Sequence, residues 1–199
     1  MKSNVCKIEN GIRNLEAILQ ESENVANYNG LNQNQTLQLR LLCEEIDGML
    51  PKIIGDFDGE FWIEYENGIC KMNISIEFSD FTIEKKKELI SVATNKKNAA
   101  VKGLVSRICS AIEDFFLSEG NYEPYDMETS CYYLPSELHP GVDYFNLWRL
   151  EQYKSTITQE ENKEEWDELE KSIIASIADD VIVGVKGRKA NIIIVKKFV

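Results

Sequence analysis

Two alternating segments around the dipeptide Asn67-Gly68 constrain the fold of this 199-residue chain more than any other feature. Residues 60–67 and 69–78 each alternate apolar and polar side chains, which is the pattern of a strand with one buried face. Asparagine followed by glycine supplies the two positive-φ residues that a type I′ turn requires. We therefore predict a β-hairpin over these residues, with its apolar face towards a core.

The C-terminal residues predict a second hairpin. Apolar residues alternate over 181–185, residues 186–189 (KGRK) form the turn, and 192–195 are apolar without interruption. An uninterrupted apolar run is typical of a central strand that is buried on both faces.

Four other stretches repeat apolar residues at helical spacing, at about 8–21, 36–50, 99–117 and 161–176. The Asn- and Gln-rich residues between the first two predict a loop, and a short helix can form at 83–94. Pro51 should end or kink the second helix near residue 50, because proline removes a backbone donor. Residues 118–160 hold three of the four prolines and many aromatic residues, and we interpret them as an insertion.

This order of elements predicts an α+β fold. We expect a two-layer sandwich, in which helices cover one face of a mixed, mostly antiparallel sheet. The length of 199 residues fits a single domain, with residues 1–33 as an N-terminal helix and loop.

Composition narrows the classes of function. The chain has 22 basic and 34 acidic residues and a net charge of −12, which disfavours binding to nucleic-acid phosphates. It shows no apolar run near the roughly 18 to 20 residues of a membrane span and no signal-like start, so we expect a cytoplasmic protein without membrane contact. The five cysteines are widely spaced and His139 is the only histidine, which disfavours a disulfide framework or a zinc site.

The segment LRLLCEEIDGML (39–50), a hairpin, an apolar helix opening with KGLVSRI (102–108) and a terminal hairpin follow one another in this chain. This arrangement resembles the GHKL ATPase domain, and in particular the anti-sigma-factor and histidine-kinase ATP-binding domains. More narrowly, it resembles a group of uncharacterised bacterial ATP-binding-like proteins. The similarity covers residues 34–117 and 165–198, and it implies a Bergerat-type fold with ATP as cofactor.

In this family a helix carries a glutamate that orients water and, four residues later, an asparagine that holds Mg²⁺. Glu44 stands at the glutamate position, with Glu45 as the alternative register. The asparagine position is then Gly48 or Met49, and neither side chain can bind a hard cation. An efficient ATPase or kinase is therefore not expected, and a role for Mg²⁺ stays open.

The resemblance also implies residues for the nucleotide. Asp80 stands where the family aspartate receives the adenine amino group, although residues 80–84 lack the glycines of the family loop, and a strand-end cap is the alternative. A segment at the start of the helical stretch 99–117 would meet the phosphates; its members are Asn98, Lys102, Gly103 and Leu104. Gly103 can equally serve close helix–sheet packing.

Two hypotheses for the function remain. The first is a nucleotide-binding regulatory domain that binds ATP or a relative without efficient turnover. The second is a GHKL-like fold that has lost its nucleotide and binds a protein partner through aromatic residues of 118–160. An unrelated α+β enzyme is a third and more distant alternative.

The acidic pair Asp179-Asp180 is a further candidate. These two residues can touch a cation, or they can begin a strand at a solvated corner of the fold.

Overall fold

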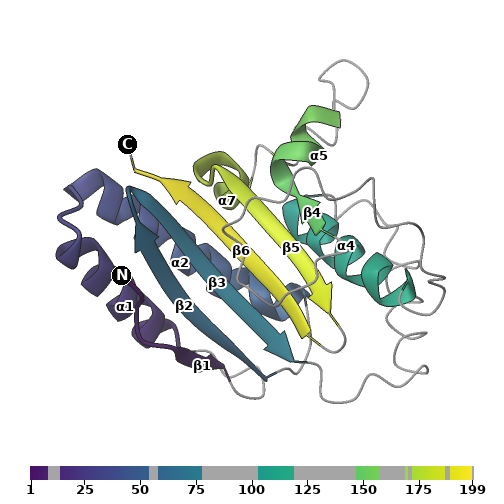
Figure 1. The fold of residues 1–199 in the computed structure, drawn as a ribbon, viewed down its shortest axis with the longest axis horizontal. Coiled ribbons are helices and arrows are strands. Elements are labelled where there is room, and N and C mark those ends of the chain that lie inside the picture. The colour runs from purple at the N-terminus through teal and green to yellow at the C-terminus, as the bar shows by residue number, and fades with distance from the viewer. Residues whose placement is uncertain are drawn as a thin grey trace.

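The computed structural model describes residues 1–8, 14–53, 58–77, 103–118, 147–156, 169, 172–186 and 189–198. Within these residues six strands form one sheet in the order β1-β2-β3-β6-β5-β4 (Figure 1). The strands are β1 (Cys6–Ile8), β2 (Asp58–Glu66), β3 (Ile69–Glu77), β4 (Leu147–Arg149), β5 (Asp180–Lys186) and β6 (Lys189–Lys197). The helices are α1 (Leu15–Tyr28), α2 (Gln33–Ile53), α4 (Leu104–Ser118), α5 (Leu150–Thr156) and α7 (Ile173–Ile177).

Both predicted hairpins are confirmed. Strands β2 and β3 are joined by Asn67 and Gly68, whose φ angles are 50° and 79°, as a turn of the predicted kind requires. Strands β5 and β6 pair from Asp180 with Val195 to Lys186 with Lys189. Strand β6 lies between β3 and β5, so the prediction of a central strand is also correct.

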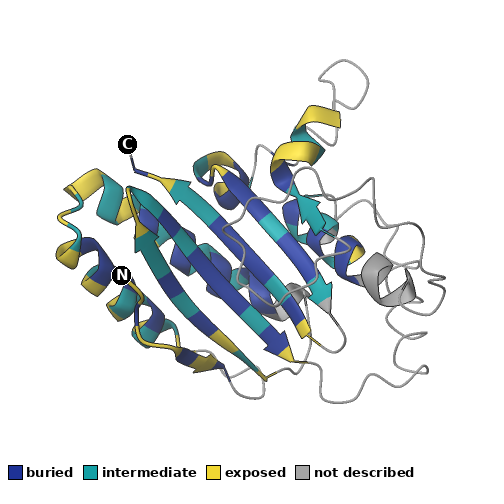
Figure 2. Ribbon diagram, in the orientation of Figure 1, coloured by how far each residue is buried: buried dark blue, intermediate teal, exposed yellow. Residues whose placement is uncertain are grey.

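One face of the sheet packs against the helices. In Figure 1, α2 and α7 lie behind the strands, with α1 next to β2 and α4 next to β5, and Figure 2 shows buried residues alternating along β2, β3 and β6. Phe61, Ile74 and Ile192 share one cross-strand row and are at most 1% exposed. The same core takes in the inner sides of α2 and α4, through Leu39, Leu42, Ile46, Leu50, Leu104 and Ile108.

The first two helices do not have the predicted bounds. Residues 6–8 form strand β1 against β2, and the first helix begins only at Leu15, where the Asn14 side chain accepts from the Ala17 N–H at 3.2 Å. The predicted loop is wrong, because α1 continues to Tyr28 and α2 begins at Gln33. The helix α2 also continues past Pro51 to Ile53, since proline this close to a helix end removes only one hydrogen bond.

The predicted insertion at 118–160 is not supported. Residues 147–149 form β4, which pairs with β5 and closes that edge of the sheet, and α5 follows with Leu150 fully buried. The sheet is antiparallel throughout the described strands, not mixed. The predicted helix over 99–117 corresponds to α4. Of the one over 161–176, the described part is Leu169 and α7, and the short helix at 83–94 lies outside the described residues.

No helix in the described part of the chain is long and apolar enough to cross a membrane.

Candidate functional site

Glu44, the expected catalytic glutamate, lies on the outer surface of α2. Arg40, one turn earlier, donates from Nε to Glu44 Oε1 at 3.1 Å and from Nη1 to Glu23 Oε1 of α1 at 2.9 Å. The three side chains are 39% to 44% exposed. The arrangement ties α1 to α2, and the Glu44 carboxylate is therefore engaged in a surface ion pair.

Asp47 is the most deeply buried acidic residue of α2, with 4% of its surface exposed. It lies one turn after the buried Cys43 and one turn before the buried Leu50, so it belongs to the core-facing stripe of the helix. Asp47 was not among the site residues predicted from the sequence. The signal was present, because a carboxylate at this spacing interrupts an otherwise apolar stripe.

Gly48, the expected position of the metal-binding asparagine, is open on its side-chain side. A Cβ atom built on it meets no heavy atom within 4 Å. The glycine is half-buried and has no side-chain oxygen. At this turn, α2 thus combines a buried carboxylate at position 47 with an open space at position 48.

Gly103 and Leu104 open helix α4. Gly103 has a φ of 154°, and its carbonyl oxygen accepts the Arg107 N–H at 3.1 Å, so it starts the helical hydrogen-bond series. Leu104 is 2% exposed and packs in the core that α2 also lines. The other expected nucleotide contacts, Asp80, Asn98 and Lys102, lie outside the described residues.

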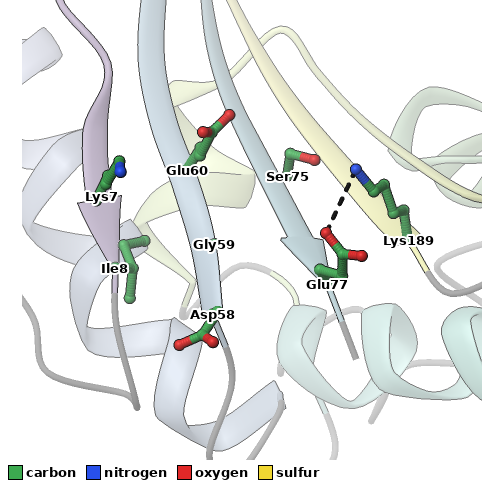
Figure 3. Close-up of a pocket in the computed structure, with 8 residues that line it drawn as sticks. All are labelled: Lys7, Ile8, Asp58, Gly59, Glu60, Ser75, Glu77 and Lys189. Atoms are coloured by element: carbon green, nitrogen blue, oxygen red, sulfur yellow. Dashed lines mark ion pairs between the residues drawn. The ribbon is translucent and has the colours of Figure 1, made fainter. Parts of the chain in front are cut away.

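The opposite face of the sheet carries a polar hollow of about 380 Å³ (Figure 3). It lies over β1, β2, β3 and the start of β6, and its lining comprises Lys7, Ile8, Asp58, Gly59, Glu60, Ser75, Glu77 and Lys189. Glu77 and Lys189 form an ion pair at 3.4 Å with side chains 61% and 57% exposed. An ion pair so exposed contributes little to the free energy of folding. We therefore interpret the hollow as a charged surface of the sheet.

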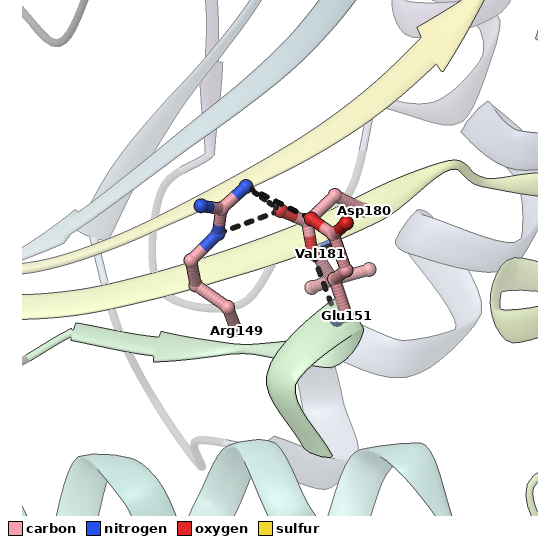
Figure 4. Close-up of polar contacts among 4 residues, drawn as sticks. All are labelled: Arg149, Glu151, Asp180 and Val181. Atoms are coloured by element: carbon pink, nitrogen blue, oxygen red, sulfur yellow. Dashed lines mark hydrogen bonds and ion pairs between the residues drawn. The ribbon is translucent and has the colours of Figure 1, made fainter. Parts of the chain in front are cut away.

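Asp180 begins strand β5, as one of the two expectations for the Asp179-Asp180 pair had it, but its carboxylate is buried and not solvated (Figure 4). Its Oδ2 accepts from Arg149 Nε at 2.8 Å and from Nη2 at 2.5 Å. Its Oδ1 accepts from the backbone N–H groups of Glu151, at 3.1 Å, and Val181, at 2.9 Å. These bonds satisfy the carboxylate and attach the β4–α5 segment to β5.

Asp179 is exposed and also serves the fold. Its Oδ2 accepts the Lys197 backbone N–H at 2.6 Å and lies 3.3 Å from Lys196 Nζ. Both carboxylates of the pair therefore accept hydrogen bonds from other residues of the fold.

Three cysteines lie in the core as free thiols, namely Cys6, Cys43 and Cys70. Burial raises the pKa of Cys70 to about 12 and raises that of Cys43 further above its ordinary value. Because the thiolate is the reactive species, these thiols are poor nucleophiles and poor metal ligands. Across the described residues, no group of three or more His, Cys, Asp or Glu side chains is arranged to hold a metal ion.

No protein-family model, no curated protein and no solved structure matches this chain.

Proposed function

We propose that this chain is a nucleotide-binding regulatory domain of the GHKL type, with a Bergerat-type fold, which binds an adenine nucleotide without efficient turnover. The order of α2, the β2–β3 hairpin, α4 and the β5–β6 hairpin supports the proposal. These elements lie on one sheet with helices packed on one of its faces, which supports the proposal, whereas the expected mixed sheet is antiparallel throughout the described strands.

The contact between α2 and α4 carries the proposal. The resemblance assigns nucleotide-binding roles to the second half of α2 and to the segment that opens α4. These segments are distant in the sequence, and both helices line the same core behind the sheet. A nucleotide bound at this contact would lie beside the second half of α2 and the start of α4.

Weak turnover follows from the position of Glu44. A general base must reach the attacking water with its carboxylate. The Glu44 carboxylate instead contacts Arg40 on the outer side of α2. Asp47 is only 4% exposed, so its carboxylate does not take the place of Glu44 beside an attacking water. Binding without chemistry suits a domain that regulates another protein.

The protein-interaction alternative draws on the aromatic residues of 118–160. Two of the described ones are used within the fold: the ring centroids of Trp148 and Tyr153 are 5.9 Å apart, and Arg107 of α4 lies 4.9 Å from the Tyr153 ring. This packing leaves these residues less suited to anchor a partner, and we therefore favour the nucleotide.

A thermal-shift titration with ATP and ADP tests the proposal. A ligand that binds only the native state raises the melting temperature as its concentration passes the dissociation constant. We expect a saturable rise for the native chain and for Glu66→Gln, a matched loss of one exposed carboxylate at the end of β2. Asp80→Asn should lose the rise.

Absence of any rise at millimolar nucleotide would show that the domain does not bind nucleotides. An equal rise in Asp80→Asn would remove Asp80 from the proposed site.

A further inference from the structure

The metal that the GHKL resemblance implies does not fit the described residues of α2. Mg²⁺ requires a set of oxygen ligands in near-octahedral geometry. Position 48, where the family oxygen would stand, is a glycine, and the Glu44 carboxylate lies against the Arg40 guanidinium at 3.1 Å. The donor set of the family is therefore not reproduced on this helix.

The neighbouring carboxylates do not replace it. Asp47 is 4% exposed and lies on the core-facing side of α2. Glu45, two residues earlier on the same helix, is half-buried. These two residues and Glu44 do not form a group that could hold a metal ion, nor does any other set within the described parts of the chain.

There is nevertheless space for a side chain at position 48, which lies on the same side of α2 as Glu44. A Cβ atom at Gly48 meets nothing within 4 Å, so the residue type and not steric occlusion removes the oxygen. Gly48 also lies inside a long helix, where glycine is less stable than alanine. A side chain at this position is thus sterically allowed and would lower the free energy of the helix.

We propose that the nucleotide site of this domain binds its ligand without Mg²⁺, because Gly48 replaces the side chain that would hold the metal. This inference rests on the proposed function. It distinguishes the domain from a dormant ATPase, in which metal and nucleotide would bind together. The nucleotide is then held by contacts to the protein alone, and its affinity does not depend on the free Mg²⁺ concentration.

Calorimetric titration of ATP and of ADP, in Mg²⁺ and in EDTA, tests the inference on three chains. The native chain should bind with the same dissociation constant in both buffers. Gly48→Asn restores a side-chain oxygen and should bind at least about tenfold more tightly in Mg²⁺ than in EDTA. Gly48→Ala fills the same space without an oxygen and should show no difference between the buffers.

The outcomes separate the two proposals. Native binding that is about tenfold tighter in Mg²⁺ would overturn the metal-free inference and leave the proposed function standing. No native binding in either buffer would overturn both. The native chain could also bind equally in both buffers while Gly48→Asn shows no tighter binding in Mg²⁺ than in EDTA. This result would overturn the claim that Gly48 is the reason for metal-free binding.

Discussion

Arg40 and Glu44 form an ion pair of 3.1 Å one turn apart on α2, and the same guanidinium reaches Glu23 of α1 at 2.9 Å. The pair directs the expected catalytic glutamate to the outer surface of the helix layer. It is therefore a contact between helices, and the role that the sequence resemblance assigns to Glu44 does not match this orientation.

Replacing Glu44 with glutamine should change little. An exposed ion pair four residues apart on a helix contributes about 0.3–0.5 kcal/mol, so Glu44→Gln should lower the free energy of unfolding by no more than that. Phosphate release in the presence of ATP should stay at background for the native chain and for the variant. Urea denaturation and a phosphate assay measure the two effects. A native release rate that Glu44→Gln abolishes would show that Glu44 is catalytic.

Alanine at two glycines should have opposite effects. At Gly48 it replaces a helical glycine whose Cβ direction is open, so the free energy of unfolding should rise by about 0.5–1 kcal/mol. At Gly68 the φ angle is 79° and the new Cβ would lie 3.3 Å from the Phe198 carbonyl oxygen, so Gly68→Ala should destabilise the hairpin. Urea midpoints compare the pair. A loss of stability in Gly48→Ala would mean that another group occupies the space beside α2.

Asp180→Ala should be the more costly of two acidic substitutions. It removes four hydrogen bonds from a carboxylate whose side chain is 8% exposed and leaves Arg149 without this partner. We expect a loss of about 2–3 kcal/mol. The neighbouring Asp179 is exposed, and Asp179→Ala should cost about 1 kcal/mol for its backbone bond. Equal losses in the two variants would contradict the structural role of Asp180.

The buried thiols make the stability fall at alkaline pH. Burial raises the pKa of Cys70 to about 12, whereas an unfolded thiol has a pKa of about 8.5. Between these values the native state keeps a proton that the unfolded state loses, so the free energy of unfolding falls as pH rises, by up to about 1.4 kcal/mol per pH unit. The stabilising contribution is complete below about pH 8.5.

Urea denaturation across the alkaline range, repeated on Cys70→Ala, isolates this contribution. The variant should lose less stability per pH unit than the native chain. Parallel curves for the two proteins would show that Cys70 ionises equally in the folded and unfolded states.

The sequence predicts the two hairpins because their signals are local. Asn67 and Gly68 set the turn, and alternation within each strand sets the buried face. Helix α4 was also predictable, from one broad apolar face of its own residues.

The edges of the sheet were missed because their signals are not local. Strand β1 has three residues, and it is extended because Cys6 pairs with Phe61, far along the chain. Strand β4 is equally short and pairs through Trp148 with Val183. Nothing in so short a segment distinguishes a strand from a loop until its partner is known.

The sequence placed Glu44 on a helix, but it did not give the direction of the Glu44 carboxylate. The spacing of Arg40 and Glu44 indicates an ion pair on its own. The contribution of Glu23 depends on how α1 packs against α2, which local patterns do not contain. The open space at Gly48 likewise depends on what surrounds α2 in three dimensions.

Amide hydrogen exchange with and without ADP tests the central claim most directly, because it reports both whether a nucleotide binds and where. We predict slower exchange in the second half of α2, around Asp47 and Gly48, and in the first turn of α4 after Gly103. We predict no change in residues of β2 and β3 around the polar hollow. Unchanged exchange throughout, or protection confined to that hollow, would contradict the proposed site.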